Sequence, residues 1–130
     1  MELHLKIIGY LFIALAILHV FFSNYFKWKE ELTSLSLINK QMMEVHTFFI
    51  ALVVFGNGIL NIFYTDELIN NDFGKVISFG LFVFWSIRLV FQLFIYSSKL
   101  WKGKSFETSM HVLFTCFWIY CSAVYYLAWK

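Results

Sequence analysis

The sequence contains no proline, and charged residues make up only 14% of its 130 positions. The absence of proline permits long uninterrupted helices and excludes proline-rich linkers. Soluble domains average about 25% charged and about 45–50% apolar residues. This chain is 61% hydrophobic and 22% aromatic. Its composition therefore excludes a soluble globular domain as well as a disordered chain, and an integral membrane protein remains.

Chemical motifs are also scarce. The two cysteines, Cys116 and Cys121, lie in one hydrophobic segment at a spacing that points them to different faces of a helix, so they are poorly placed to form a disulfide with each other. The sequence has no HExxH, GxSxG or CxxC motif and no glycine-rich phosphate loop. A net charge of +2, without a basic stripe, excludes nucleic acid as a partner.

Four long hydrophobic segments are present, at about residues 5–23, 45–64, 76–97 and 109–129. Each is close to the ~20 apolar residues that a helix needs to cross a bilayer. All four are apolar on every face, which argues against alternating barrel strands. We predict an all-α integral membrane protein, an antiparallel four-transmembrane-helix bundle that forms a single domain over residues 1–130.

The segment between the first two helices is longer than a turn and has two interpretations. Trp28, Leu32, Leu35 and Met42 fall near one face of a helix over residues 27–42, which is typical of a short amphipathic helix at the membrane surface. The alternative is that the first and second membrane helices simply extend beyond the bilayer. The two other loops are short, so sequential helices are expected to be antiparallel neighbours.

The lysines predict the orientation in the membrane. Loops 24–44 and 98–108 must lie on the same side, and they hold six lysines: Lys27, Lys29, Lys40, Lys99, Lys102 and Lys104. The opposite side holds three: Lys6, Lys75 and Lys130. The positive-inside rule places the six-lysine side in the cytoplasm. We therefore expect a protein of the bacterial inner membrane, with both termini outside.

Polar residues within the hydrophobic segments are the best indicators of function, because polar groups are costly in hydrocarbon. They are His19, His46, Asn57, Asn61, Arg88, Gln92 and His111, with Glu44 at the cytoplasmic mouth of the second helix. At 1.5 Å rise per residue, the three histidines and Gln92 fall in one layer near the cytoplasmic face, and Arg88 lies one turn deeper. Each of these helices carries its polar residues on one stripe, which predicts an intramembrane polar site open toward the cytoplasm.

The predicted site suits several chemistries. His19, His46 and His111 could ligate a transition metal, with Glu44 as a carboxylate ligand. Two histidines could instead ligate haem b, while Arg88, Gln92 and Lys99 bind the cofactor around it. In a third interpretation, Arg88 binds an anionic head group or a quinone oxygen and a histidine transfers protons.

Each of these residues also has a purely structural interpretation. His46 and His111 lie near enough to the interface to be solvated surface histidines. Asn57, Asn61 and Gln92 are typical of hydrogen bonds between membrane helices. Arg88 requires a partner wherever it lies, and that partner could belong to another subunit.

Three functions remain open on the sequence alone. The first is a metal- or haem-binding membrane protein, with redox activity as one option. The second is an accessory or scaffold subunit of a larger membrane complex or a homo-oligomer, without catalysis of its own. The third is an enzyme or carrier that binds a lipid- or quinone-like small molecule. The lipid bilayer is the one partner common to all three.

Overall fold

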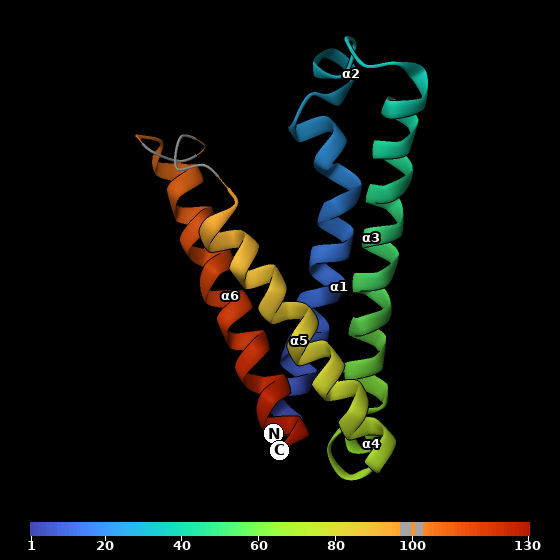
Figure 1. Ribbon diagram of the computed structural model, residues 1–130, viewed down its shortest axis with the longest axis vertical. Coiled ribbons are helices and arrows are strands. Elements are labelled where there is room, and N and C mark those ends of the chain that lie inside the picture. Colours follow the sequence, from blue (N-terminus) through green and yellow to red (C-terminus); the bar gives the residue numbers. More distant parts are fainter. Residues whose placement is uncertain (97–99, 101–102) are drawn as a thin grey trace. The chain divides into compact units, whose positions relative to one another are not determined.

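The computed structural model describes residues 1–96, 100 and 103–130, and within them it contains helices and no strand. Figure 1 shows the helices in chain order: α1 (Glu2–Tyr25), α2 (Trp28–Glu31), α3 (Leu37–Phe63), α4 (Thr65–Asn70), α5 (Asp72–Phe94) and α6 (Ser105–Trp129). Helices dominate because a chain in lipid must satisfy its backbone N–H and C=O groups internally, and a helix does so within one segment.

Four of these helices, α1, α3, α5 and α6, are long and apolar enough to cross a membrane. They correspond one to one with the four segments that hydropathy predicts. The predicted fold class, an all-α protein with four membrane-spanning helices, is therefore confirmed, and the protein is an integral membrane protein.

The helices extend beyond the apolar segments. α3 begins at Leu37 rather than near residue 45, because Ser36 caps it: the Ser36 hydroxyl accepts a hydrogen bond from the backbone N–H of Asn39 at 3.4 Å. α5 begins at Asp72, where the Asn71 side chain accepts hydrogen bonds from the N–H groups of Phe73 and Gly74. Hydropathy locates the part of a helix that is apolar, whereas capping residues decide where it starts.

The connection between α1 and α3 does not form the amphipathic helix expected over residues 27–42. Its only helix is the single turn α2, preceded by Lys27 in a left-handed conformation with φ of 54°. Residues 37–42 belong to α3, so the second membrane helix extends as the alternative interpretation proposed. The short loop predicted after the second membrane helix contains the short helix α4.

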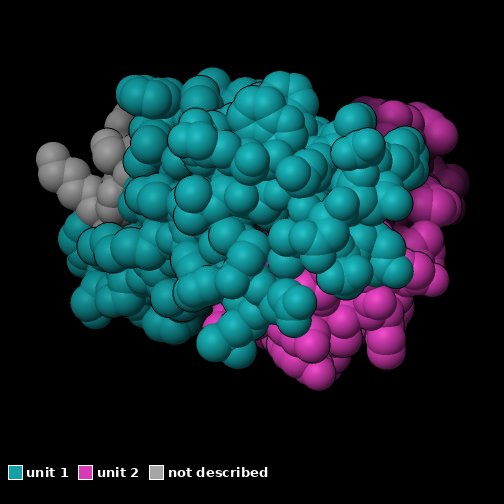
Figure 2. Space-filling view, turned by 90° about the horizontal axis from the view of Figure 1, so that it is seen from below, with its two compact units in different colours: residues 1–4, 66–130 teal, residues 5–65 magenta. Residues whose placement is uncertain are grey.

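The chain divides into two compact units, which Figure 2 shows in different colours: residues 5–65, and residues 1–4 with 66–130. In the unit of residues 5–65, α1 and α3 pack antiparallel at Gly9 and Gly58. A Cβ atom on Gly9 would lie 2.9 Å from the Gly58 carbonyl oxygen, and one on Gly58 would lie 2.8 Å from the Gly9 carbonyl oxygen. Small residues at this crossing let the two backbones approach closely.

The other unit is built on the antiparallel pair α5 and α6, with α4 folded against the start of α5. A Cβ atom on Gly74 would overlap the Glu67 carbonyl oxygen, so glycine is required where α5 meets α4. One turn further along α5, the Ser78 hydroxyl donates a 3.1 Å hydrogen bond to the Leu68 carbonyl oxygen. Aromatic rings then join α5 to α6 in three pairs: Phe79–Trp129, Phe82–Tyr126 and Trp85–Trp118.

Candidate functional site

A chain of hydrogen bonds links three polar side chains between α5 and α6. Arg88 Nη1 donates to Gln92 Oε1 at 3.2 Å, and both residues lie on α5, one helical turn apart. Gln92 Nε2 lies 3.1 Å from Nδ1 of His111 on α6. Gln92 is buried, while Arg88 and His111 are half-buried. We refer to these three residues as the Arg–Gln–His chain.

The direction of each hydrogen bond follows from the arginine. A guanidinium can only donate, so the carbonyl oxygen of Gln92 must face Arg88. The amide NH₂ group of Gln92 then faces His111, and because it too can only donate, His111 Nδ1 must accept. His111 is therefore a neutral imidazole with its proton on Nε2. Arg88 fixes this tautomer through a glutamine that touches both residues.

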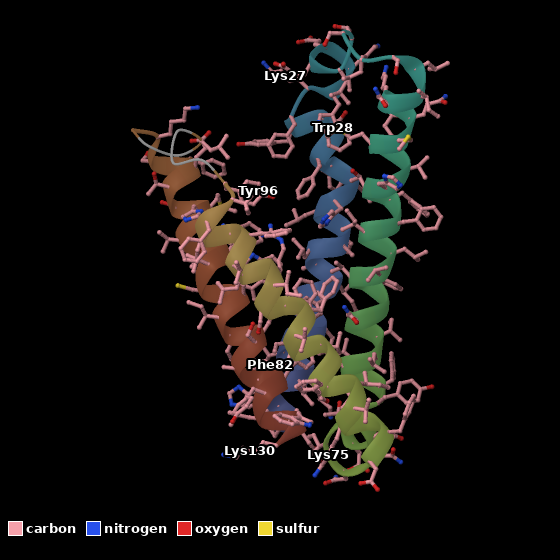
Figure 3. All side chains as sticks on the ribbon, in the orientation of Figure 1. Lys27, Trp28, Lys75, Phe82, Tyr96 and Lys130 are labelled. Atoms are coloured by element: carbon pink, nitrogen blue, oxygen red, sulfur yellow. The ribbon has the colours of Figure 1, made fainter. Side chains whose placement is uncertain are left out.

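Aromatic rings surround the guanidinium of Arg88. Its central carbon lies 5.1 Å from the ring centroid of Trp118 on α6 and 5.4 Å from that of Tyr96, which follows α5 and is labelled in Figure 3. Trp118 in turn stacks on Trp85 of α5, with centroids 4.9 Å apart and planes at 7°. Cation–π contacts stabilise a guanidinium by about 0.5–2 kcal/mol, depending on how far it is removed from water.

Among the described residues, no carboxylate contacts this arginine. In the described part of the chain, the partners of Arg88 are Gln92 and the two aromatic rings. The acidic residues of α5 and α6 are Asp72, at the far end of α5, and Glu107, one turn before His111 on α6. The site therefore carries a positive charge in largely apolar surroundings, and a further acceptor would be bound strongly there.

Two buried donors on α6 have no hydrogen-bond acceptor among the described residues. Trp118 and Ser122 are 4% and 8% exposed, and among the described residues neither Trp118 Nε1 nor Ser122 Oγ has a hydrogen-bond partner. Trp118 and Ser122 lie one helical turn apart, and the Trp118 ring is the one on α6 that contacts Arg88. A buried donor without an acceptor costs about 1–3 kcal/mol. Like Arg88, these groups can donate a hydrogen bond to an oxygen atom of a ligand.

The other predicted site residues belong to the unit of residues 5–65 or are outside the described part of the chain. His19, in the unit of residues 5–65, bonds through Nδ1 to the Leu15 carbonyl oxygen of its own helix at 2.8 Å. His46 and Glu44 are exposed on α3, in the same unit. Lys99 lies outside the described residues. The structure thus brings together Arg88, Gln92 and His111.

The proposed metal or haem site finds no support in these contacts. Among the residues that the structure describes, no group of three or more His, Cys, Asp or Glu side chains could hold a metal ion. His19 and His46 belong to one unit and His111 to the other, so their convergence stays a prediction. The Nδ1 lone pair of His111 is occupied by its hydrogen bond to Gln92.

Sequence reasoning missed two features of this unit. It did not foresee Trp118 and Tyr96 as partners of Arg88, although an arginine near aromatic residues in an apolar segment is a signal for cation–π contact. It also overlooked His4, whose Nδ1 lies 2.7 Å from the Tyr120 hydroxyl. His4 was missed because it precedes the first hydrophobic segment.

The comparisons with known proteins give no relative: no protein-family model, no curated protein and no solved structure matches the chain.

Proposed function

We propose that this membrane protein binds a lipid- or quinone-like small molecule, with Arg88 as the residue that receives its oxygen-bearing head group. The observation that carries the proposal is the charge of Arg88, which has an amide and two aromatic rings as partners and no carboxylate among the described residues. A charge in such surroundings favours an oxygen acceptor from a ligand.

The neighbouring groups support the same ligand chemistry. Trp118 Nε1 and Ser122 Oγ are buried donors without acceptors in the described chain. Together with Arg88 they offer hydrogen bonds to a carbonyl, carboxylate or phosphate oxygen. The buried, stacked indoles of Trp85 and Trp118 make the interior beside these donors apolar, and binding sites for small molecules commonly combine apolar walls with a few placed polar groups.

The test uses the fact that Arg88 is the only arginine in the sequence. A dicarbonyl reagent that modifies arginine will label the purified protein at this residue alone, and mass spectrometry reads the labelled fraction. We expect a long-chain fatty acid or a short-chain quinone to protect Arg88 from the reagent. Brominated analogues should also quench tryptophan fluorescence, because Trp118 lies against the guanidinium.

The control is an amine reagent applied in parallel. Lysines outside the site, such as Lys27 and Lys75, should be labelled equally with and without the probe. An Arg88→Met variant should lose the fluorescence quenching, because it retains side-chain length but has no charge or donor. If neither probe protects Arg88 nor quenches fluorescence in the wild type, the proposed function is wrong.

We further propose that loops 24–44 and 98–108 face the cytoplasm of a bacterial cell and that both termini lie outside. The support is the lysine distribution, with six lysines in these loops against three on the other side. Alkaline phosphatase fused after Lys130 should be active, and the same enzyme inserted near Lys40 should be inactive. The opposite pattern would reverse the orientation.

A further inference from the structure

We infer that the site binds an oxyanion together with a proton, and that the Gln92 amide couples the two binding events. This inference rests on the proposed function and names its ligand class more closely: an amphiphile with an acidic head group, bound as an anion while His111 gains a proton. Its basis is the direction of the two hydrogen bonds in the Arg–Gln–His chain.

In the structure, Gln92 connects a cation to a neutral imidazole. Its carbonyl oxygen accepts from Arg88, and its NH₂ group donates to Nδ1 of His111. The carbonyl oxygen of Gln92 is the only hydrogen-bond acceptor that Arg88 has in the described chain. While His111 is neutral, Gln92 therefore holds the guanidinium and competes with any incoming ligand.

Protonation of His111 reverses this arrangement. A proton on Nδ1 makes that nitrogen a donor, which cannot face the NH₂ group of Gln92. A half-turn of the amide brings the Gln92 oxygen to His111 and the NH₂ group to Arg88. Two donors then face each other, so Arg88 leaves Gln92 and requires another acceptor. An oxyanion supplies it, and the bound anion balances the proton that His111 has gained from solvent.

The coupling works in both directions, because linkage is reciprocal. Anion binding at Arg88 withdraws the guanidinium from Gln92, which frees the amide oxygen for a protonated His111. Among the described residues, the other charged or titratable side chains within five positions of this chain of three are Tyr96, which contacts Arg88, and Glu107 and Cys116 on the helix of His111. None of them forms part of the two hydrogen bonds that Gln92 makes.

The test measures the affinity of a brominated long-chain alkyl sulfonate across pH, by tryptophan quenching in a neutral maltoside detergent. A sulfonate is anionic at every pH used, so any pH dependence belongs to the protein. One proton taken up per anion should raise the affinity about tenfold for each unit that the pH falls while His111 is neutral. Titration calorimetry in two buffers of different ionisation enthalpy should independently give one proton bound per anion.

Three variants locate the proton. His111→Gln cannot titrate, so its affinity for the sulfonate should not change with pH. Gln92→Glu can accept from Arg88 and from a protonated His111 at once, so binding should be weaker and independent of pH. Glu107→Gln is the matched control, and it should retain the wild-type slope. Circular dichroism of each variant verifies that the helices remain folded.

The possible outcomes separate this inference from the proposed function. The coupling is overturned if the sulfonate binds with equal affinity at every pH, or if the affinity of His111→Gln for the sulfonate still changes with pH. A neutral fatty alcohol or short-chain quinone that binds while the sulfonate does not also overturns it, although the proposed lipid- or quinone-like function stands. If none of these probes binds, both are wrong.

Discussion

Replacement of Gly74 by alanine should destabilise the unit that contains the Arg–Gln–His chain. The added Cβ would overlap the Glu67 carbonyl oxygen and lie 3.0 Å from the Leu68 Cα atom. Both are backbone atoms, so α4 must move away from α5 rather than a side chain rotating aside. That movement also strains the 3.1 Å hydrogen bond from Ser78 to the Leu68 carbonyl oxygen.

The magnitude follows from three contributions. Overpacking costs about 1–3 kcal/mol, and weakening of the Ser78 hydrogen bond costs about 0.5–1.5 kcal/mol. Alanine favours the helix over glycine by about 1 kcal/mol, which offsets part of this loss. The expected net destabilisation is about 2 kcal/mol, or roughly thirtyfold in the unfolding equilibrium, since 1.4 kcal/mol corresponds to tenfold.

Cys121 provides the readout, because it is 0% exposed and belongs to the same unit. In a Cys116→Ser background it is the only thiol, and a maleimide dye can reach it only when the unit opens. Gly74→Ala should raise the labelling rate of Cys121 about thirtyfold, provided that the unit recloses faster than the dye reacts with the thiol.

The matched control is Gly80→Ala, on the same helix, where nothing lies within 4 Å of the added Cβ. This variant should label up to about fivefold more slowly than its parent, because it gains helix propensity without a clash. Equal labelling rates for the two alanine variants would refute the packing of α4 against Gly74.

Four further predictions address other parts of the molecule. Ser122→Ala removes a buried hydroxyl that has no partner among the described residues. It should therefore raise the free energy of unfolding by about 1 kcal/mol and weaken ligand binding, whereas lower stability would indicate an unseen hydrogen bond. In the unit of residues 5–65, Gly58→Ala places a Cβ 2.8 Å from the Gly9 carbonyl oxygen, while Gly56→Ala meets nothing within 4 Å. Thermal melts should thus show Gly58→Ala destabilised by about 1–3 kcal/mol and Gly56→Ala unaffected or slightly stabilised. The 2.7 Å contact between His4 and Tyr120 should give a coupling of about 1 kcal/mol in a cycle of His4→Phe and Tyr120→Phe, and additive effects would show that the two do not interact. The metal or haem hypothesis predicts stoichiometric metal or a Soret band in the purified protein. Replacing His19, His46 and His111 by alanine should remove that metal or band. A colourless, metal-free preparation of the wild-type protein would refute the hypothesis.

The sequence by itself determined the four membrane-spanning helices. Hydropathy is a local property, and an apolar segment of this length in lipid must satisfy its own backbone hydrogen bonds as a helix. The sequence also placed Arg88 and Gln92 on one stripe, because residues four apart on a helix are neighbours. The helix ends were predicted less well, since the capping by Ser36 and Asn71 lies outside the apolar segments.

Only the tertiary structure decided which groups meet across helices. The pairing of α5 with α6 sets Gln92 against His111 and the guanidinium of Arg88 against Trp118. Such contacts depend on how each helix is rotated about its axis and on close approaches such as that of Gly74 to α4. Rotation and approach are settled by side-chain packing between segments distant in the sequence, which a hydropathy pattern does not encode.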